Sequence, residues 1–157
     1  MSLRRADGSD LAAIIDLERT SFLTDAWSEA TMREELLSPH SYYLVDEEAG
    51  NLLGYAGLRS PRGARDADIQ TIAVAEPARG HGRGRALLRA LLREAKERGA
   101  HEMFLEVRAD NPGAEALYIS EGFREIARRP GYYQPDNVDA IVMTCDLRAF
   151  AAEEELS

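Results

Sequence analysis

The stretch Arg79-Gly80-His81-Gly82-Arg83-Gly84-Arg85 decides the fold because of what flanks it. Before it, residues 68–74 alternate polar and apolar side chains into an apolar end, which predicts a strand. After it, a stripe of leucines at helical spacing predicts a helix up to Arg98, with Gly99 in the usual C-cap role. The stretch is therefore expected to form a glycine-rich turn between a strand and a long helix.

Alternating glycines at the start of a helix favour an anion-binding site. A helix N-terminus offers unpaired N–H groups and partial positive charge, and glycine lets a phosphate approach the backbone. Residues 79–98 hold seven Arg or Lys and two Glu residues, a local charge of +5 in a chain of net charge −9. The turn lacks the Gly-Lys-Ser/Thr of a Walker A loop, and its third glycine comes one residue too early for a dinucleotide fingerprint. A flexible loop with a glycine cap is the alternative.

The rest of the chain predicts further strands and helices in alternation. Strands are expected over 2–6, 41–46, 52–59, 103–107, 123–129 and 139–147, with a hairpin turn over 47–51. Helices are expected to end near Phe22, Leu37 and Glu121. Ser9 or Asp10 is expected to cap the first of these helices, and Ser28 the second. Trp27 and Met32 are spaced as a hydrophobic staple around the Ser28 cap.

Composition limits the classes of partner. The chain is 45% hydrophobic and 30% charged, which is typical of a globular protein. A net charge of −9 argues against nucleic acid as a direct partner and against a polybasic membrane anchor, because both need clustered positive charge. A length of 157 residues favours one domain, expected over 1–149, followed by an acidic C-terminal tail over 150–157.

The cysteine content and the hydropathy predict a cytoplasmic location. Cys145 is the only cysteine, so no internal disulfide can form, and its β-rich surroundings favour a packed core thiol over a nucleophile. No apolar run reaches the roughly 20 residues of a membrane span. The N-terminus turns acidic before any hydrophobic stretch, unlike a secretory signal.

Several motifs together resemble the GNAT superfamily of N-acetyltransferases. Arg79-x-x-Gly82-x-Gly84, after a strand ending at 71–74, is similar to that superfamily's acetyl-CoA-binding motif. Within the superfamily, the chain resembles the bacterial ribosomal-protein-alanine N-acetyltransferases (RimI type) from the first strand to about Leu147. The matching segments are 105–111, Ala114, 116–118, Gly122-Phe123, Tyr132-Tyr133, Asp139-Ala140 with Met143, and Ala26-Trp27-Ser28. Ala26 stands where proline is usual in that group, and Arg79 where glutamine is common.

This resemblance implies a fold and two binding sides. The expected fold is a single α/β domain whose central sheet is mixed, mostly antiparallel and splayed at its middle, flanked by about four helices. Acetyl-CoA would enter one side of the splay and the amine acceptor the other. The thioester and pantetheine arm would lie along the backbone of Ile72, Ala73 and Val74. The pyrophosphate would lie against the turn formed by Arg79, Gly80, His81, Gly82, Arg83, Gly84 and Arg85.

The resemblance also implies the chemistry, a direct attack of an amine on the acetyl-CoA thioester. Glu106 is expected to act as the base, directly or through a water, and Tyr118 as the acid that protonates the CoA thiolate. A protein α-amino group has a pKa of about 7.7–8.0, so a modest base suffices. From residue type alone, Glu106 could be a strand-end carboxylate paired with Arg108 or another arginine, and Tyr118 a core aromatic. Asn111, followed by Pro112, is expected to cap a helix, and the resemblance adds a hydrogen bond to CoA.

The acceptor is the least defined part of this hypothesis. Trp27, Tyr132 and Tyr133 are expected to shape a peptide groove, with ordinary aromatic packing as the alternative. His81 and His101 are not expected to act as bases, and no residues show metal-ligand spacing. The resemblance implies the N-terminal alanine of a small-subunit ribosomal protein, the eighteenth, as the acceptor. Acetylation of a small-molecule amine is the alternative, and a non-catalytic acyl-CoA sensor is a weaker one because Glu106 and Tyr118 are both present.

Overall fold

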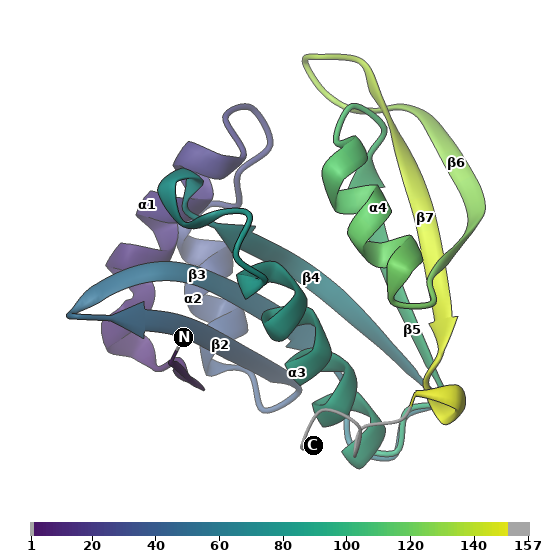
Figure 1. Ribbon diagram of the computed structural model, residues 1–157, viewed down its shortest axis with the longest axis horizontal. Helices are drawn as coiled ribbons and strands as arrows, with labels where there is room; N and C mark the ends of the chain where they lie inside the picture. The colour runs from purple at the N-terminus through teal and green to yellow at the C-terminus, as the bar shows by residue number, and fades with distance from the viewer. Residues whose placement is uncertain (1, 151–157) are drawn as a thin grey trace.

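The computed structural model describes residues 2–150, which form strands and helices in the predicted order (Figure 1). The strands are β1 (Leu3–Arg5), β2 (Ser41–Glu48), β3 (Asn51–Arg59), β4 (Asp66–Val74), β5 (Glu102–Arg108), β6 (Arg124–Tyr133) and β7 (Val138–Asp146). The α-helices are α1 (Leu11–Ser21), α2 (Glu29–Leu37), α3 (Arg83–Glu97) and α4 (Pro112–Ser120). Short 3-10 turns occur at Gly8–Asp10, Glu76–Ala78 and Leu147–Ala149.

One seven-stranded sheet runs through the described part of the chain, in the order β1-β2-β3-β4-β5-β7-β6. All neighbouring strands are antiparallel except β4 and β5. These two parallel strands pair only where Asp66, Ala67 and Asp68 meet Glu102, Met103 and Phe104. Beyond these pairs the strands diverge, and the sheet opens into two wings (Figure 1). The expected fold, a single α/β domain with a mixed, mostly antiparallel and splayed sheet, is confirmed.

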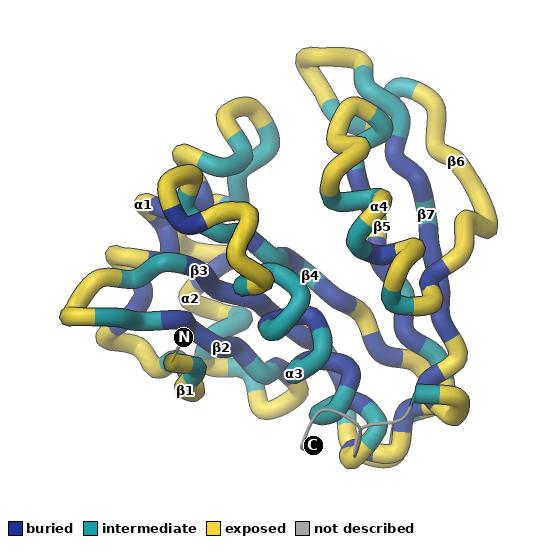
Figure 2. Tube along the Cα trace, viewed as in Figure 1, coloured by how far each residue is buried: buried dark blue, intermediate teal, exposed yellow. Residues whose placement is uncertain are grey.

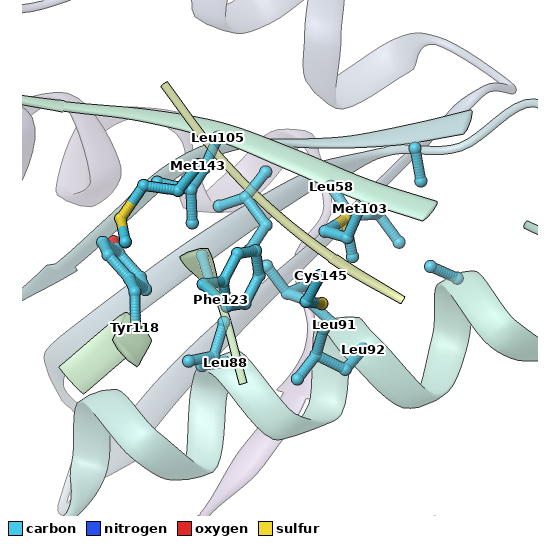
Figure 3. Packing of buried hydrophobic residues seen from close by; sticks show 14 of the residues in the cluster. Leu58, Leu88, Leu91, Leu92, Met103, Leu105, Tyr118, Phe123, Met143 and Cys145 are labelled. Carbon is cyan, nitrogen blue, oxygen red and sulfur yellow. The ribbon is translucent and has the colours of Figure 1, made fainter. Parts of the chain in front are cut away.

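Helix α3 holds the larger hydrophobic core together. Its apolar stripe is fully buried and packs on the face of the sheet formed by β2, β3 and β4: Leu87, Leu88, Leu91, Leu92 and Ala95. Each buried leucine stabilises the fold by roughly 1.5–3 kcal/mol. The same cluster continues into the β5 wing through Met103, Phe123 and Cys145 (Figure 3). The prediction that Cys145 is a packed core thiol is confirmed.

Strands β1 to β4 form the first wing of the sheet, in which much of β3 is buried (Figure 2). Helices α1 and α2 form a second core on the side of this wing opposite α3. Ile14, Ile15 and Met32 are buried there against Val45 and Tyr55 of the sheet. The partly buried Trp27 belongs to the same cluster, as expected for the partner of Met32 in a hydrophobic staple. The first wing therefore carries helices on both faces, which fixes the position of the segment joining α1 to α2.

Asp10 is the N-cap residue of α1, as predicted, but its side chain makes no cap hydrogen bond to this helix. The Asp7 carboxylate caps the preceding 3-10 turn by accepting the Ser9 N–H at 2.8 Å. The Asp10 carboxylate accepts the Asp7 N–H at 2.9 Å in return, which completes a capping box around one 3-10 turn. Helix α1 begins only after this turn. The cap of α2 is confirmed, since the Ser28 hydroxyl accepts the Thr31 N–H at 3.1 Å.

The hairpin between β2 and β3 is tighter than the predicted turn over 47–51. Only Ala49 and Gly50 form the turn, both with positive φ, and this matches the twist of a two-residue hairpin. Glu47 and Glu48 remain in β2, where their carboxylates pair with arginines of other elements. Pairing of Glu47 with Leu52 and of Glu48 with Asn51 therefore extends β2 beyond the point where local sequence patterns had ended it.

The described part of the chain ends at Phe150. Phe150 packs against the larger core, and its carbonyl accepts a hydrogen bond of 2.6 Å from Lys96. Residues 151–157 lie outside the described residues, so the acidic tail over 150–157 stays a prediction. Within residues 2–150, no helix combines the length and the apolar character that crossing a membrane requires.

Candidate active site

A cleft of about 920 Å³ opens where β4 and β5 diverge. Its walls come from those two strands, from α4, from the segment between α1 and α2, and from the β6–β7 turn. It brings together seven of the residues predicted from the sequence: Trp27, Ile72, Glu106, Asn111, Tyr118, Tyr132 and Tyr133. Ala73, Val74 and residues 79–85 do not line this cleft. A second pocket of about 470 Å³ shares Glu106 and Trp27 with it.

Glu106 lies on β5 between the two pockets. Its side chain is 32% exposed, and its ion pair is a loose one, with Oε1 3.9 Å from Arg129 Nη2. Arg108 is not its partner, because that guanidinium binds other carboxylates. The contact with Arg129 is a pair with another arginine, which the alternative interpretation had allowed. A carboxylate that is accessible and only loosely paired can accept a proton from a group in the cleft.

Tyr118 lies on α4 and is only 8% exposed. Its ring meets Phe123 edge-on at 5.8 Å, and Figure 3 shows it at the edge of the core beside Met143. Burial alone raises the pKa of its hydroxyl to about 12. Tyr118 also lines the cleft. It is therefore both a core aromatic and a protonated hydroxyl group at the site.

The glycine turn presents open backbone at the start of α3. Gly80 and Gly82 have φ of +82° and +81°, the left-handed region that favours glycine, and no atom lies within 4 Å of a Cβ added at either position. Gly82 is the N-cap of α3, so the N–H groups of the first turn, from Arg83 onward, have no partner within the helix. Gly84 differs, because a Cβ there would face Leu117 at 3.6 Å.

The arginines of this turn are engaged by carboxylates and carbonyls from other elements. Arg83 binds Asp46 at 2.8 Å and Glu48 at 3.1 Å, both on β2. Arg85 pairs with Glu121, and Arg79 Nε donates to the carbonyl of Val74 at 2.9 Å. The local excess of positive charge seen in the sequence is therefore largely balanced in space. What the turn offers an anion is chiefly backbone N–H groups.

Asn111 joins β5 to α4 at the rim of the cleft. Its Oδ1 accepts the Ala114 N–H at 3.2 Å, so the predicted cap is confirmed. His81 and His101 are both exposed and do not line the cleft. Within residues 2–150, no three His, Cys, Asp or Glu side chains are arranged to hold a metal ion.

Sequence reasoning missed a buried carboxyl group at the cleft, that of Glu18 on α1, which is 1% exposed. It accepts hydrogen bonds from Tyr55 and Thr71 on neighbouring strands and from the N–H of Trp27. Burial, as the largest cause, raises the pKa of Glu18. The signal was present, because Glu18 continues the i, i+4 spacing of the apolar face from Ile14.

Sequence reasoning also missed a cluster of charges at the mouth of the cleft. Arg108 lies within ion-pair distance of Asp25, Asp110 and Asp136. Asp25 and Asp136 are 83 and 28 residues away from Arg108 along the chain, so no local sequence pattern predicts the cluster.

Comparison with known proteins finds relatives of this chain among the acetyltransferases. The profile of the acetyltransferase (GNAT) family matches residues 11–123. The N-alpha-acetyltransferase RimI of Mycobacterium tuberculosis is 40% identical over 150 residues, which are 92% of this chain and 90% of that protein. The crystal structure of the ribosomal-protein-S18-alanine N-acetyltransferase from Escherichia coli matches with a TM-score of 0.84 and 31% identity, over 96% and 95% of the two chains. The structure of yncA from Salmonella typhimurium with its cofactor acetyl-CoA matches with a TM-score of 0.77 and 25% identity, over 96% of each chain.

Proposed function

Because the chain belongs to the GNAT family of acetyltransferases, we propose that this acetyl-CoA-dependent N-acetyltransferase acts on a protein N-terminal α-amine. The proposed acceptor is the N-terminal alanine of small-subunit ribosomal protein S18, in line with the name of the Escherichia coli structure. The observation that carries the proposal is the cleft between β4 and β5. It gathers a loosely paired carboxylate, a protonated phenol and three aromatic side chains at one site.

Acetyl-CoA supplies the activated acetyl group, and the chain's own residues handle the protons. Glu106 takes a proton from the acceptor ammonium, directly or through a water, and this leaves the amine lone pair free to attack the thioester carbonyl. Tyr118 gives its phenolic proton to the sulfur as the C–S bond breaks. The attacking nitrogen loses its second proton as the amide forms, and a proton taken up through solvent restores the phenol. The products are an N-acetyl amide and a thiol. With a pKa of about 12, the Tyr118 hydroxyl is protonated at neutral pH and is available as a proton donor.

The residues proposed to hold acetyl-CoA fit its chemistry. A pyrophosphate needs N–H donors and backbone that can be approached closely, and the open turn at Gly80 and Gly82 meets both needs. An amide-bearing arm needs extended backbone, and β4 beyond Asp68 has no β5 partner. We assign the arm to Ile72, Ala73 and Val74, with Asn111 as a further hydrogen-bonding group at the rim of the cleft.

The acceptor side is assigned to Trp27, Tyr132 and Tyr133. Tyr132 and Tyr133 meet edge-on with ring centroids 5.2 Å apart, and Tyr132 is 49% exposed. Rigid aromatic faces at the mouth of a cleft suit an extended peptide, because they supply contact area at a low entropic cost. A ribosomal acceptor also implies that the enzyme works in the cytoplasm. The net charge of −9 supports a protein N-terminus, and not nucleic acid, as its direct partner.

Mass spectrometry of ribosomal proteins from a parent strain and a deletion strain tests the acceptor. The expected result is an acetylated S18 N-terminus in the parent strain and a free amine in the deletion strain. The purified enzyme should acetylate a peptide with that N-terminal sequence far faster than it acetylates small-molecule amines. Acetylation that persists in the deletion strain, or a preference for small amines, would replace the proposal with the small-molecule alternative.

A further inference from the structure

Arg108 holds carboxylates from three separate segments. It lies at the C-terminal end of β5, and its side chain is only 17% exposed. Its Nε and Nη2 bind both oxygens of Asp110 at 2.9 and 3.0 Å. Nη2 also reaches Asp136 at 3.0 Å, and Nη1 reaches Asp25 at 3.3 Å. The guanidinium lies over the ring of Tyr133, 5.2 Å from its centroid.

These contacts cross the splay of the sheet. Asp25 belongs to the segment between α1 and α2, which packs on the first wing, whereas Asp136 belongs to the β6–β7 turn of the second wing. The Thr24 hydroxyl adds a direct hydrogen bond of 2.6 Å to Asp136. The strands of the two wings share only three residue pairs, at the far end of β4 and β5. The Arg108 cluster therefore joins the wings again at the mouth of the cleft.

We propose that Arg108 is a positioning residue for the acceptor, which holds the Thr24–Asp25 segment against the β6–β7 turn and so sets the width of the acceptor side of the cleft. The part of this inference that concerns the acceptor rests on the proposed function. Glu106 and Arg108 are two residues apart on β5 and project from the same face of the strand. A shift of the two segments thus changes the path of the acceptor beside Glu106, while the glycine turn at the start of α3 stays in place.

The charges explain why this arrangement depends on one side chain. Three carboxylates surround a single guanidinium, so the cluster is held by Arg108 against the mutual repulsion of its acids. Substitution by glutamine leaves Asp25, Asp110 and Asp136 facing one another, and repulsion moves the two segments apart. Lysine keeps the charge but cannot bind Asp110 with two nitrogens and reach the other carboxylates at once.

Hydrogen–deuterium exchange on the free enzyme tests the positioning directly. Arg108→Gln is expected to raise backbone exchange in both 22–27 and 134–137. The matched control is Arg148→Gln, which removes a similar two-nitrogen pair with Asp146 at the opposite end of β7 and should leave both segments unchanged. Unchanged exchange in Arg108→Gln, or an equal rise in the control, would overturn the proposal. This measurement needs no acceptor, so it decides the role of Arg108 even if the proposed acceptor is wrong.

Steady-state kinetics with a peptide carrying the S18 N-terminal sequence tests the consequence for the reaction. Arg108→Gln should raise the KM for the peptide about tenfold and change the KM for acetyl-CoA by less than about twofold, with Arg108→Lys in between. Asp25→Asn removes the ion pair between Arg108 and Asp25 but leaves the Thr24–Asp136 hydrogen bond, so it should show the same selective effect in milder form. The double variant should then cost less than the sum of the two single variants, since they remove one shared interaction. Equal effects on both substrates, or strictly additive effects, would contradict a positioning role.

Discussion

The backbone N–H of Trp27 donates a hydrogen bond of 2.9 Å to the buried carboxyl group of Glu18. Tyr55 and Thr71 donate to the other oxygen of the same group, from β3 and β4. One buried side chain on α1 thereby links two strands to the segment that carries Trp27 into the cleft. The placement of an aromatic residue on the acceptor side depends on a polar group in the second core.

The Glu18 linkage predicts an unusual dependence of stability on pH. Burial raises the pKa of Glu18 above its ordinary value of 4.5, so the folded protein holds this proton more tightly than the unfolded chain. Its contribution to the free energy of unfolding is therefore fully present below the ordinary pKa and is lost as the pH rises through the folded-state pKa. Glu18→Gln cannot ionise, so the stability of the parent relative to this variant should fall as the pH rises.

Urea unfolding from about pH 4 to about pH 8 measures this difference. Glu34→Gln, which removes an exposed carboxylate on α2, controls for the loss of one acid. If the free energy of unfolding of the parent, minus that of Glu18→Gln, grows with pH, Glu18 is instead a stabilising anion in the folded state.

Tyr118→Phe is expected to keep the fold and lose the acid. The ring and its edge-on contact with Phe123 remain, while the proton proposed for the leaving sulfur is gone. The single-turnover rate should fall by roughly 10²–10⁴-fold, the usual size of general acid catalysis, with acetyl-CoA affinity little changed. Tyr42→Phe, a half-buried tyrosine away from the cleft, is the matched control. A near-parent rate in Tyr118→Phe would remove the acid role.

Glu106→Gln should lower the rate most at low pH. The acceptor amine is then mostly protonated, so a base matters most, and the deficit should shrink as free amine accumulates at high pH. Single-turnover rates between about pH 6 and about pH 9 test this, with Glu102→Gln at the other end of β5 as the control. A deficit that does not depend on pH would make Glu106 a group that positions the amine.

Gly82→Val is expected to lower the affinity for acetyl-CoA, whereas the same change at a comparable glycine elsewhere is not. Gly82 and Gly50 have nearly the same φ, +81° and +80°, and a Cβ meets nothing within 4 Å at either. Valine should therefore cost a similar strain at both, about 1–2 kcal/mol for the backbone conformation. Only Gly82 lies at the start of α3, so calorimetry should show a loss of acetyl-CoA affinity in Gly82→Val and none in Gly50→Val. Equal affinity in the two variants would move the pyrophosphate away from this turn.

Features set by neighbouring residues were predictable from the sequence. The stripe of α3, the Ser28 cap and the Asn111 cap all depend on residues within one or two turns of helix, and all three are confirmed. At the start of α1 only the position of the cap residue, Asp10, was predicted correctly, because the side chains of Asp7, Ser9 and Asp10 compete within four positions. Tertiary contact then decides, since Arg4 binds the Asp10 carboxylate at 2.8 Å.

Long-range pairing was not predictable. Asp46, which binds Arg83, lies 37 residues away, and Glu121, which binds Arg85, lies 36 residues away. A local charge count therefore overstated the free positive charge of the turn. The gathering of Glu106 and Tyr118 in one cleft followed from the family resemblance. Neither the spacing nor the composition of the chain would have placed these two side chains together.

The short pairing of β4 with β5 leaves two strand edges facing each other inside the molecule. Beyond Asp68, β4 keeps β3 on one side only, and such an edge is normally a template on which another chain can pair and aggregate. Here the space beside it is walled by α4 and by the segment before α2, which keeps the flat edge of another protein out. A single slender chain with its own amides can still add to β4 as an extra strand. The same gap thus closes the strand edge to another folded protein and leaves it open to a linear ligand that carries amides.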